Sequence, residues 1–237
     1  MIRILALTSL LLGPLGAWEP AFGLQLGLNR TRHQGVDLSA SSGNLAVDAD
    51  PQQGPLVRGL FDVRLGDGWF LETSLGWRGR SSSGLHYRGD HAGTGDLDAV
   101  LVMKEQVMLG ALVSRGIPHA GGAWSAGLGI DLRQDQIALE VHKGTSGTRL
   151  VRPWLRSALR WSGRGSGRWF AGLEIAIPLS RPGVTAENYL SDLDRLDAGV
   201  NPAAGSAARA HAPTSEWSVV LGLRLPGSGA ARTSVPR

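Results

Sequence analysis

Apolar residues recur at every second position along much of this chain, with polar residues or glycines between them, most clearly between residues 149 and 180. From Trp169 to Leu179 an almost unbroken apolar set shares one parity, while Gly172 and Glu174 have the other. The segment before it separates residues in the same way, with Arg152, Arg156 and Arg160 against Val151, Leu155, Leu159 and Trp161. Because the side chains of a β-strand point alternately to its two faces, this pattern predicts two antiparallel strands joined by a tight Gly- and Ser-rich turn.

With Gly165 at the centre of that turn, Arg156 would lie opposite Glu174 and Trp161 opposite Trp169. One face would then carry an ion pair and the other a tryptophan pair. Two arrangements fit such a hairpin. In a soluble sandwich the apolar face points inward, whereas in a membrane barrel the apolar face meets lipid and the charged face lines the inside.

The same alternation recurs in eight segments, which we predict to be strands: 22–30, 56–65, 69–80, 97–114, 123–133, 151–161, 169–180 and 216–225. The alternation is poor around Lys104 and Glu105. Past residue 133 the apolar parity changes, because Ile137, Leu139 and Val141 continue the parity of the polar residues. This change indicates a bulge or a hairpin that leaves the membrane.

The connections between these segments alternate between long and short. Short turns are predicted at 66–68, 116–122 and 162–167, and polar loops at 34–54, 81–95, 142–148 and 181–215. Within the last loop, residues 186–196 have helical spacing and would either cap the mouth of a barrel or dock a partner. Single-chain outer-membrane barrels have an even strand number, short periplasmic turns and long outer loops, whereas a Greek-key sandwich has no reason to alternate so regularly. The pattern therefore predicts an all-β fold, a closed eight-stranded antiparallel up-and-down transmembrane barrel.

Energetics indicate which face of the strands meets lipid. An arginine on the lipid face near the midplane costs roughly 2–4 kcal/mol, so we expect the in-phase arginines to point inward, with inward glycines relieving their crowding. The predicted interior network is Arg58, Asp62, Arg64, Glu72, Arg78, Asp131, Arg133, Arg152, Arg156, Arg160, Glu174 and Arg224. The predicted membrane-interface aromatics, next to the turns and loops, are Trp69, Trp77, Trp124, Trp161, Trp169 and Trp217. Trp154 has the parity of the arginines and does not fit these belts.

Composition narrows the function classes. The formal net charge is +4, but the arginines are scattered, so no nucleic-acid groove is expected. The absence of cysteine excludes a disulfide framework and a thiolate metal site. Residues 1–17 fit a secretory signal peptide, because Arg3 precedes an apolar stretch that Gly13 and Pro14 end well short of a spanning helix. We therefore expect a signal peptide at 1–17, a barrel at 18–225 and a disordered tail at 226–237.

The segments WSAGLGIDLR, WFAGLEIAIPL and EWSVVLGLRL, with the signal sequence and the eight alternating strands, resemble the small eight-stranded outer-membrane β-barrel proteins of the OmpA/OmpX/OmpW type. The resemblance covers residues 18–225 at the level of pattern. It implies a place in the outer membrane of a Gram-negative-type bacterium, with outer-membrane lipid, lipopolysaccharide and the barrel-insertion machinery as partners. One departure is that the last strand of such proteins usually ends on an aromatic residue, where this chain has Leu225 followed by a tail.

Two functions of such a barrel fit the pattern. We expect a monomer of structural, envelope-stabilising or adhesive type, filled by an arginine–carboxylate network. The alternative is a narrow porin-like conduit for small or apolar solutes, which needs an interior gap or a lateral opening. A soluble periplasmic barrel that binds a ligand would need an apolar interior, which the in-phase arginines contradict.

A membrane-embedded lipid-modifying enzyme is the remaining candidate. His86, Asp90 and His91 share a predicted outer loop with Ser81–Ser83, and a histidine near a serine and an acid is able to activate a nucleophile. Nothing in the sequence fixes their geometry, and solvated loop residues explain the cluster more simply. We therefore expect no enzyme activity, no catalytic residues, no cofactor and no metal site.

Overall fold

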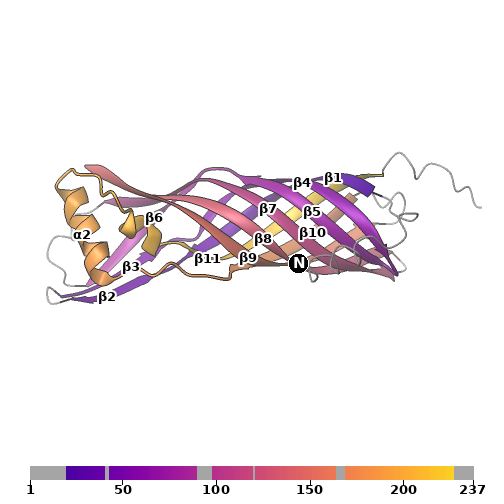
Figure 1. Cartoon of the computed structure of the whole chain (residues 1–237), viewed down its shortest axis with the longest axis horizontal. Helices are drawn as coiled ribbons and strands as arrows, with labels where there is room; N and C mark the ends of the chain where they lie inside the picture. Colours follow the sequence, from indigo (N-terminus) through magenta and orange to yellow (C-terminus); the bar gives the residue numbers. More distant parts are fainter. Residues whose placement is uncertain (1–19, 41–42, 90–97, 120, 164–168, 227–237) are drawn as a thin grey trace, which may run out of the picture.

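The computed structural model describes residues 20–40, 43–89, 98–119, 121–163 and 169–226. Its eight long strands are β1 (Pro20–His33), β4 (Gln52–Gly66), β5 (Trp69–Arg78), β7 (Ala99–His119), β8 (Gly122–Val141), β9 (Gly144–Gly163), β10 (Trp169–Pro178) and β11 (Pro213–Pro226). They pair in the ring order β1–β4–β5–β7–β8–β9–β10–β11, and β11 pairs again with β1 (Figure 1). Every pairing in this ring is antiparallel. The predicted closed eight-stranded barrel is therefore confirmed.

The two faces of the ring have opposite chemistry. On β11, Val219 and Leu221 are more than half exposed, whereas Val220 between them is buried. On β1, Leu26 is 51% exposed and the neighbouring Gln25 is fully buried. An apolar outer surface around a polar interior is the arrangement of a barrel surrounded by lipid. A soluble barrel that binds a ligand would have the reverse arrangement, so the structure contradicts that alternative.

Two connections are tighter than predicted. β7 continues through Pro118 to His119 and β8 begins at Gly122, so the turn predicted at 116–122 shrinks to two residues. β8 and β9 are separated only by His142 and Lys143, where a loop over 142–148 was predicted. Each of these strands has 20 residues, about twice what a tilted membrane crossing needs. Their shared hairpin therefore extends beyond the bilayer.

The predicted register of the β9–β10 hairpin is wrong. Arg156 lies opposite Ala176, and Trp161 lies opposite Ala171. The neighbour of Trp161 across the other edge of β9 is Trp124. Because the pairing is offset by an even number of residues, each side chain keeps its predicted face. Residues 164–168, which include the predicted turn centre, lie outside the described residues.

Two of the predicted polar loops contain strands. β2 (Val36–Ala40) and β3 (Gly43–Ala49) form a hairpin within 34–54, and β6 (Ser81–Gly89) occupies much of 81–95. The pairing order β2–β3–β6–β7 makes them an extension of the barrel wall (Figure 1). These segments were predicted as loops because they are rich in Ser, Gly and Asp. They also contain apolar residues at every second position, and the structure buries them: Val36, Leu38, Leu45 and Val47.

The interior changes from charged to aliphatic where the strands leave the membrane. On β8 the buried series that includes Asp131 and Asp135 continues to Ile137 and Leu139, and the β8–β9 pairing is unbroken throughout. The pattern changes past residue 133 because the β8–β9 hairpin leaves the membrane there, and its buried side chains become aliphatic instead of charged. The β8–β9 pairing itself contains no bulge. The irregularity lies in the β7–β8 pairing, which skips residues 104 and 105 of β7.

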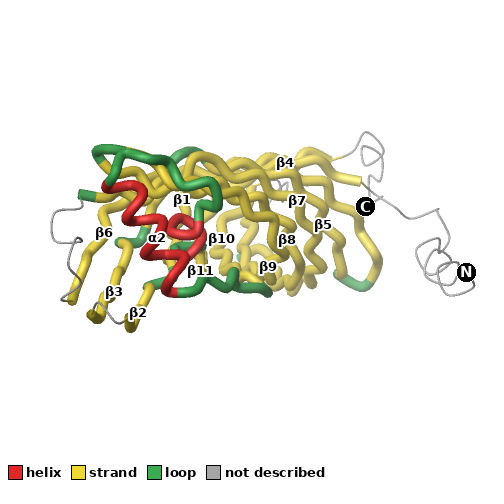
Figure 2. Tube along the Cα trace, turned by 60° about the vertical axis from the view of Figure 1, so that its left-hand side comes forward, coloured by secondary structure: helices red, strands yellow, loops and turns green. Residues whose placement is uncertain are grey.

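Helices cover the end of the barrel away from the short turns. The helix predicted at 186–196 is confirmed as α2 (Ala186–Asp197), and a second helix, α3 (Ser206–Ala210), was not predicted. The Thr185 side chain caps α2 by accepting a hydrogen bond from the Asn188 backbone N–H at 3.3 Å. Leu193 and Leu196 join an apolar core shared with β2, β3, β7, β8 and α3, and Figure 2 shows α2 beside the β2–β3–β6 extension. We call this extramembrane assembly of β2, β3, β6, α2 and α3 the cap.

The ends of the chain lie outside the described residues. This applies to the predicted signal peptide at 1–17 and to residues 227–237 of the predicted tail. Among the residues that are described, no helix has the length and apolar character needed to cross a membrane.

Candidate functional site

The interior of the barrel holds an ion-pair network. Its cations are Arg58, Arg78, Arg133, Arg152, Arg156, Arg160 and Arg224, and its anions are Asp62, Glu72, Asp131, Asp135, Glu174 and Glu216. All are buried except Arg224, whose side chain is 26% exposed. Because a buried charge is tolerable only when it is paired and hydrogen-bonded, the network explains how so many charges fill one lumen.

The middle of the network is organised around two glutamates. Glu72 accepts hydrogen bonds from Arg156, at 3.1 Å, and from both terminal nitrogens of Arg160. Glu174 accepts from Arg160 at 2.6 Å and from Arg58 at 3.1 Å. Arg58 also donates to Asp131 Oδ2 at 3.1 Å, so this cluster joins strands from opposite sides of the ring.

A second group lies toward the cap. Arg133 donates to Glu216 at 2.9 Å, and Arg152 donates to Asp135 at 2.9 Å. The Trp154 ring is fully buried between these two arginines, with guanidinium carbons 4.4 Å and 5.3 Å from its centroid. Cation–π contacts of this kind stabilise a cation that has been removed from water, which gives an interior role to the tryptophan that did not fit the lipid belts.

The structure places every predicted network residue in these ion pairs except Arg64. Arg64 is exposed, because β4 and β5 shift register between Arg64 and Gly66 and the alternation of β4 ends at the turn. Two carboxylates were missed, although their sequence parity marks them. Glu216 has the parity of Arg224 on β11, and Asp135 has the parity of Asp131 on β8.

The predicted interface tryptophans are all on the outer surface, between 40% and 60% exposed: Trp69, Trp77, Trp124, Trp161, Trp169 and Trp217. Trp69, Trp124, Trp161 and Trp169 lie close to the short-turn end of their strands, and Trp77 and Trp217 close to the cap end. The guanidinium of Arg115 lies 5.6 Å from the centroid of the Trp69 ring. Such pairs of belts mark the two membrane interfaces.

Inward glycines make room for the arginines. A Cβ atom at Gly76 would lie 2.8 Å from Arg58 Cγ and 3.0 Å from Met108 Cε. A Cβ atom at Gly172 would lie 2.7 Å from Arg160 Cγ. Any larger residue at these positions would displace the arginine stems, so the absence of a side chain is part of how the lumen closes.

Side chains of the network fill the middle of the lumen. The gap bounded by Arg58, Arg133, Arg156, Glu174 and Glu216 is too small to hold a water molecule. An eight-stranded ring is only just wide enough for its interior to be filled by side chains. Long arginines on a ring of this size therefore take up much of its interior.

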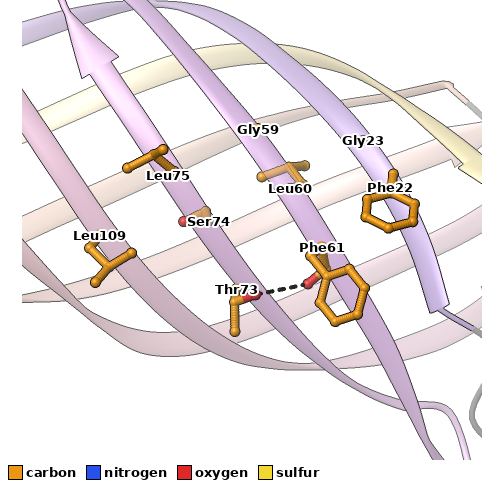
Figure 3. Close-up of a pocket in the computed structure, with 9 residues that line it drawn as sticks. All are labelled: Phe22, Gly23, Gly59, Leu60, Phe61, Thr73, Ser74, Leu75 and Leu109. Carbon is orange, nitrogen blue, oxygen red and sulfur yellow. Dashed lines mark hydrogen bonds between the residues drawn. The ribbon is translucent and has the colours of Figure 1, made fainter.

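An open depression of about 370 Å³ lies in the outer wall (Figure 3). Gly59 forms part of its floor, and Phe22, Phe61 and Leu75 stand around it. The hydroxyl of Thr73 donates to the Phe61 carbonyl at 3.4 Å. Apart from Thr73 and Ser74, the residues that line the depression are apolar or glycine.

The candidate nucleophile cluster lies only partly within the described residues. Ser81 donates to Gln52 at 3.0 Å, and Ser83 accepts from Gln52 at 3.2 Å. His86 is exposed on β6 and pairs with Asp50 at 3.0 Å. Asp90 and His91 lie outside the described residues. Within the described part of the chain, no group of three or more His, Cys, Asp and Glu side chains is placed to hold a metal ion.

Two buried histidines join the cap to the barrel. His33 Nδ1 donates to the carbonyl oxygen of His211 at 2.9 Å, and His211 Nδ1 donates to the carbonyl oxygen of Gln34 at 3.1 Å. Nε2 of His211 is thereby left as an acceptor, and the Tyr189 hydroxyl donates to it at 2.8 Å. Burial lowers the pKa of His33 and of His211 from 6.5 to about 4, and it raises the pKa of Tyr189. Both imidazoles are therefore neutral near pH 7.

No protein-family model matches the chain, and no curated protein matches it by sequence. Among solved structures, Ail, the attachment invasion locus protein of Yersinia pestis, in complex with the heparin analogue sucrose octasulfate, matches with a TM-score of 0.43 and 10% identity, covering 87% of this chain and 99% of that one. Neisserial surface protein A matches with a TM-score of 0.39 and 10% identity, covering 87% and 97%. Ail and Neisserial surface protein A are small eight-stranded outer-membrane barrel proteins, the class that the sequence resembles. Similarity at this level carries no information about function.

Proposed function

We propose that this chain is an outer-membrane barrel of structural, envelope-stabilising or adhesive type, with a sealed lumen and a folded cap outside the bilayer. The observation that supports this most is the lumen packing, because the gap among Arg58, Arg156 and Glu216 is too small for water. Breaking a buried ion pair by removing one partner costs about 3–5 kcal/mol. Opening a path would separate several such pairs, so the porin-like alternative is disfavoured.

Conductance in planar bilayers tests the sealed lumen. The purified full chain is added to one chamber, and a porin measured in the same bilayers serves as the positive control. We expect no current steps above background at moderate voltage. Steady unitary steps from the wild-type chain would contradict the proposal and favour the conduit.

We also propose that the chain is no enzyme. The expected result is that the mass of lipid A is unchanged when the chain is overexpressed.

Lipopolysaccharide is the lipid partner that we propose for the cap side. Arg30, opposite Trp217 in the β1–β11 register, is exposed next to the belt at that end. Lys104 and Arg149 are exposed on β7 and β9 beyond the membrane-spanning part, and such cations attract lipid phosphates. We expect lipopolysaccharide to raise the thermal unfolding temperature of the wild-type chain more than that of the triple variant Arg30→Gln, Lys104→Gln, Arg149→Gln. Equal shifts would contradict this assignment.

The barrel-insertion machinery is the other partner that we propose. β11 ends at Pro226, and Leu225 lies on the lipid face opposite Phe22. Since the resembled class usually has an aromatic residue in that place, Leu225→Phe is expected to increase the folded fraction in the outer membrane. The ratio of heat-modifiable to unfolded protein on gels measures this fraction, and Leu223→Phe on the same face is the matched control.

A further inference from the structure

Within the described part of the chain, β2 is the edge strand of the cap. Among the described strands it pairs with β3 on one side and with no strand on the other. Val36 and Leu38 are 9% and 8% exposed in the apolar core of the cap, while Asp37 and Ser39 are exposed. An edge strand displays unpaired N–H and C=O groups that another strand is able to continue. Its core-facing side chains hold β2 in place for such pairing.

We propose that β2 pairs antiparallel with β2 of a second copy of this chain whose barrel lies in a facing membrane. This inference rests on the function proposed above, and it names the partner for the adhesive form of that function.

Self-pairing is favoured by the register that centres on Leu38. With Leu38 opposite itself, Asp37 faces Ser39 of the other copy, twice by symmetry. The carboxylate then meets a hydroxyl that is able to donate to it, and no like charges are opposed. Centring on Asp37 would instead place two carboxylates opposite each other and leave part of the strand unpaired. Asp37 is the single charged residue of β2, so the register that pairs all five residues opposes no like charges.

The backbone fits the same register. In an antiparallel ladder, alternate residues direct their N–H and C=O groups to the same neighbour. A two-fold axis at Leu38 pairs residues of equal parity, so whichever alternate set faces the free edge of β2 meets the identical set of the partner. Such an interface is isologous, because one surface patch serves both copies.

The direction of β2 places the partner in another membrane. Strands that meet through the same edge are related by a two-fold axis perpendicular to their sheet, and they run in opposite directions. β2 runs along the long axis of the molecule rather than across it, at the end farthest from the short turns (Figure 1). The partner barrel must therefore point the opposite way. Two copies in one bilayer point the same way and cannot form this pairing.

Each contact is small, because the strand has only five residues. A single pair is therefore expected to dissociate in detergent, in agreement with the expected monomer. Many copies on two facing surfaces act together, however, since the first contacts raise the effective concentration for the rest.

Vesicle clustering tests the inference with the full chain. Phospholipid vesicles carrying the protein are followed by light scattering, and a donor- and an acceptor-labelled population are mixed to detect contact between vesicles. We expect clustering that increases with protein density. Ser39→Asp should reduce it to the level of protein-free vesicles, because Asp37 then faces a second carboxylate. Adding Asp37→Lys to Ser39→Asp should restore it, since each introduced lysine then faces an introduced aspartate of the other copy.

Ser82→Asp introduces the same charge at an exposed position of β6 away from this edge, and it should leave clustering unchanged. Heat-modifiable migration verifies that each variant is folded. Wild-type vesicles that stay dispersed, or Ser39→Asp vesicles that cluster as well as wild type, would overturn the inference. If such vesicles are also free of conductance, the proposed function stands while this inference fails, whereas a conducting wild type refutes the proposed function itself.

Discussion

Glu72 shows how much of the lumen depends on one residue. Its carboxylate is 1% exposed and contacts the guanidiniums of Arg156, Arg160 and Arg224. Glu72 and Arg160 are 88 residues apart in the chain. Parity is sufficient to place both in the interior. It does not show that they meet, because contacts across a closed ring depend on strand tilt and stagger, which no local pattern encodes.

Removing the carboxylate should therefore destabilise the barrel. We expect Glu72→Ala to lower the free energy of unfolding by about 3–5 kcal/mol, because buried cations are left unpaired. Urea unfolding in lipid vesicles, followed by tryptophan fluorescence, measures the change. Glu105→Ala on β7, where the side chain is exposed, is the matched control. If the two variants unfold at the same urea concentration, Glu72 does not have this role.

Crowding around Gly76 gives a second prediction at this scale. A methyl group there would press on Arg58 and Met108, and overpacking of this kind costs about 1–3 kcal/mol. We expect Gly76→Ala to lower the thermal unfolding temperature, measured by heat-modifiable migration. Gly84→Ala on β6, where nothing lies within 4 Å of the added carbon, should leave it unchanged. An unaltered Gly76→Ala would show that the lumen is loosely packed.

At the scale of elements, sequence patterns succeeded where an element buries one continuous face. α2 was predicted because its apolar residues recur at helical spacing. Each barrel strand was predicted because its lipid-facing residues are apolar at every second position. β2, β3 and β6 were missed because they are short and polar in composition. Their burial arises only when β2, β3 and β6 join α2 and the extended β8–β9 hairpin. Such long-range assembly leaves little signal in any one segment, although the alternation around Val36 and Leu45 was present.

The connection between the cap and the barrel should depend on pH. The folded pKa of His33 and His211 is lowered to about 4, whereas the unfolded value is 6.5. Between these values the unfolded state binds more protons, so the stability of the cap is fully present above about pH 6.5 and is lost as the pH falls toward 4. The total loss is on the order of 3 kcal/mol per histidine.

Amide hydrogen exchange over residues 186–212, corrected for the intrinsic effect of pH, measures this loss. Protection of α2 should decrease between pH 6.5 and 4.5 in the wild type. His119→Gln is the matched control, because His119 is exposed at the end of β7. This variant should show the same decrease in protection as the wild type. His33→Gln combined with His211→Gln should flatten the profile. A wild-type profile that is already flat would contradict the role of these histidines.

At the scale of the whole molecule, the fold follows from where water is absent. Outside the ring lipid replaces water, so every second residue is apolar, and inside it the arginines must find carboxylates. Above the bilayer, water surrounds the wall again and the interior becomes aliphatic at Ile137 and Leu139. Strand number, closure and the lipid face were predictable because each leaves a repeated trace in the sequence. The strands of the cap were not, because they form once in the chain, although its helix α2 was predicted from its spacing.

The orientation of the side chains is the central claim, and the absence of cysteine makes it directly measurable. Single cysteines at residues 218, 219, 220 and 221 of β11, each carrying a spin label, are compared for collision with oxygen and with a water-soluble nickel complex in lipid vesicles. Labels at Val219 and Leu221 should collide readily with oxygen, as lipid-exposed groups do. Labels at Ser218 and Val220 should be shielded from both reagents in the packed lumen. The opposite alternation, or high exposure of residues 218 and 220 to the nickel complex, would contradict a sealed ionic lumen surrounded by lipid.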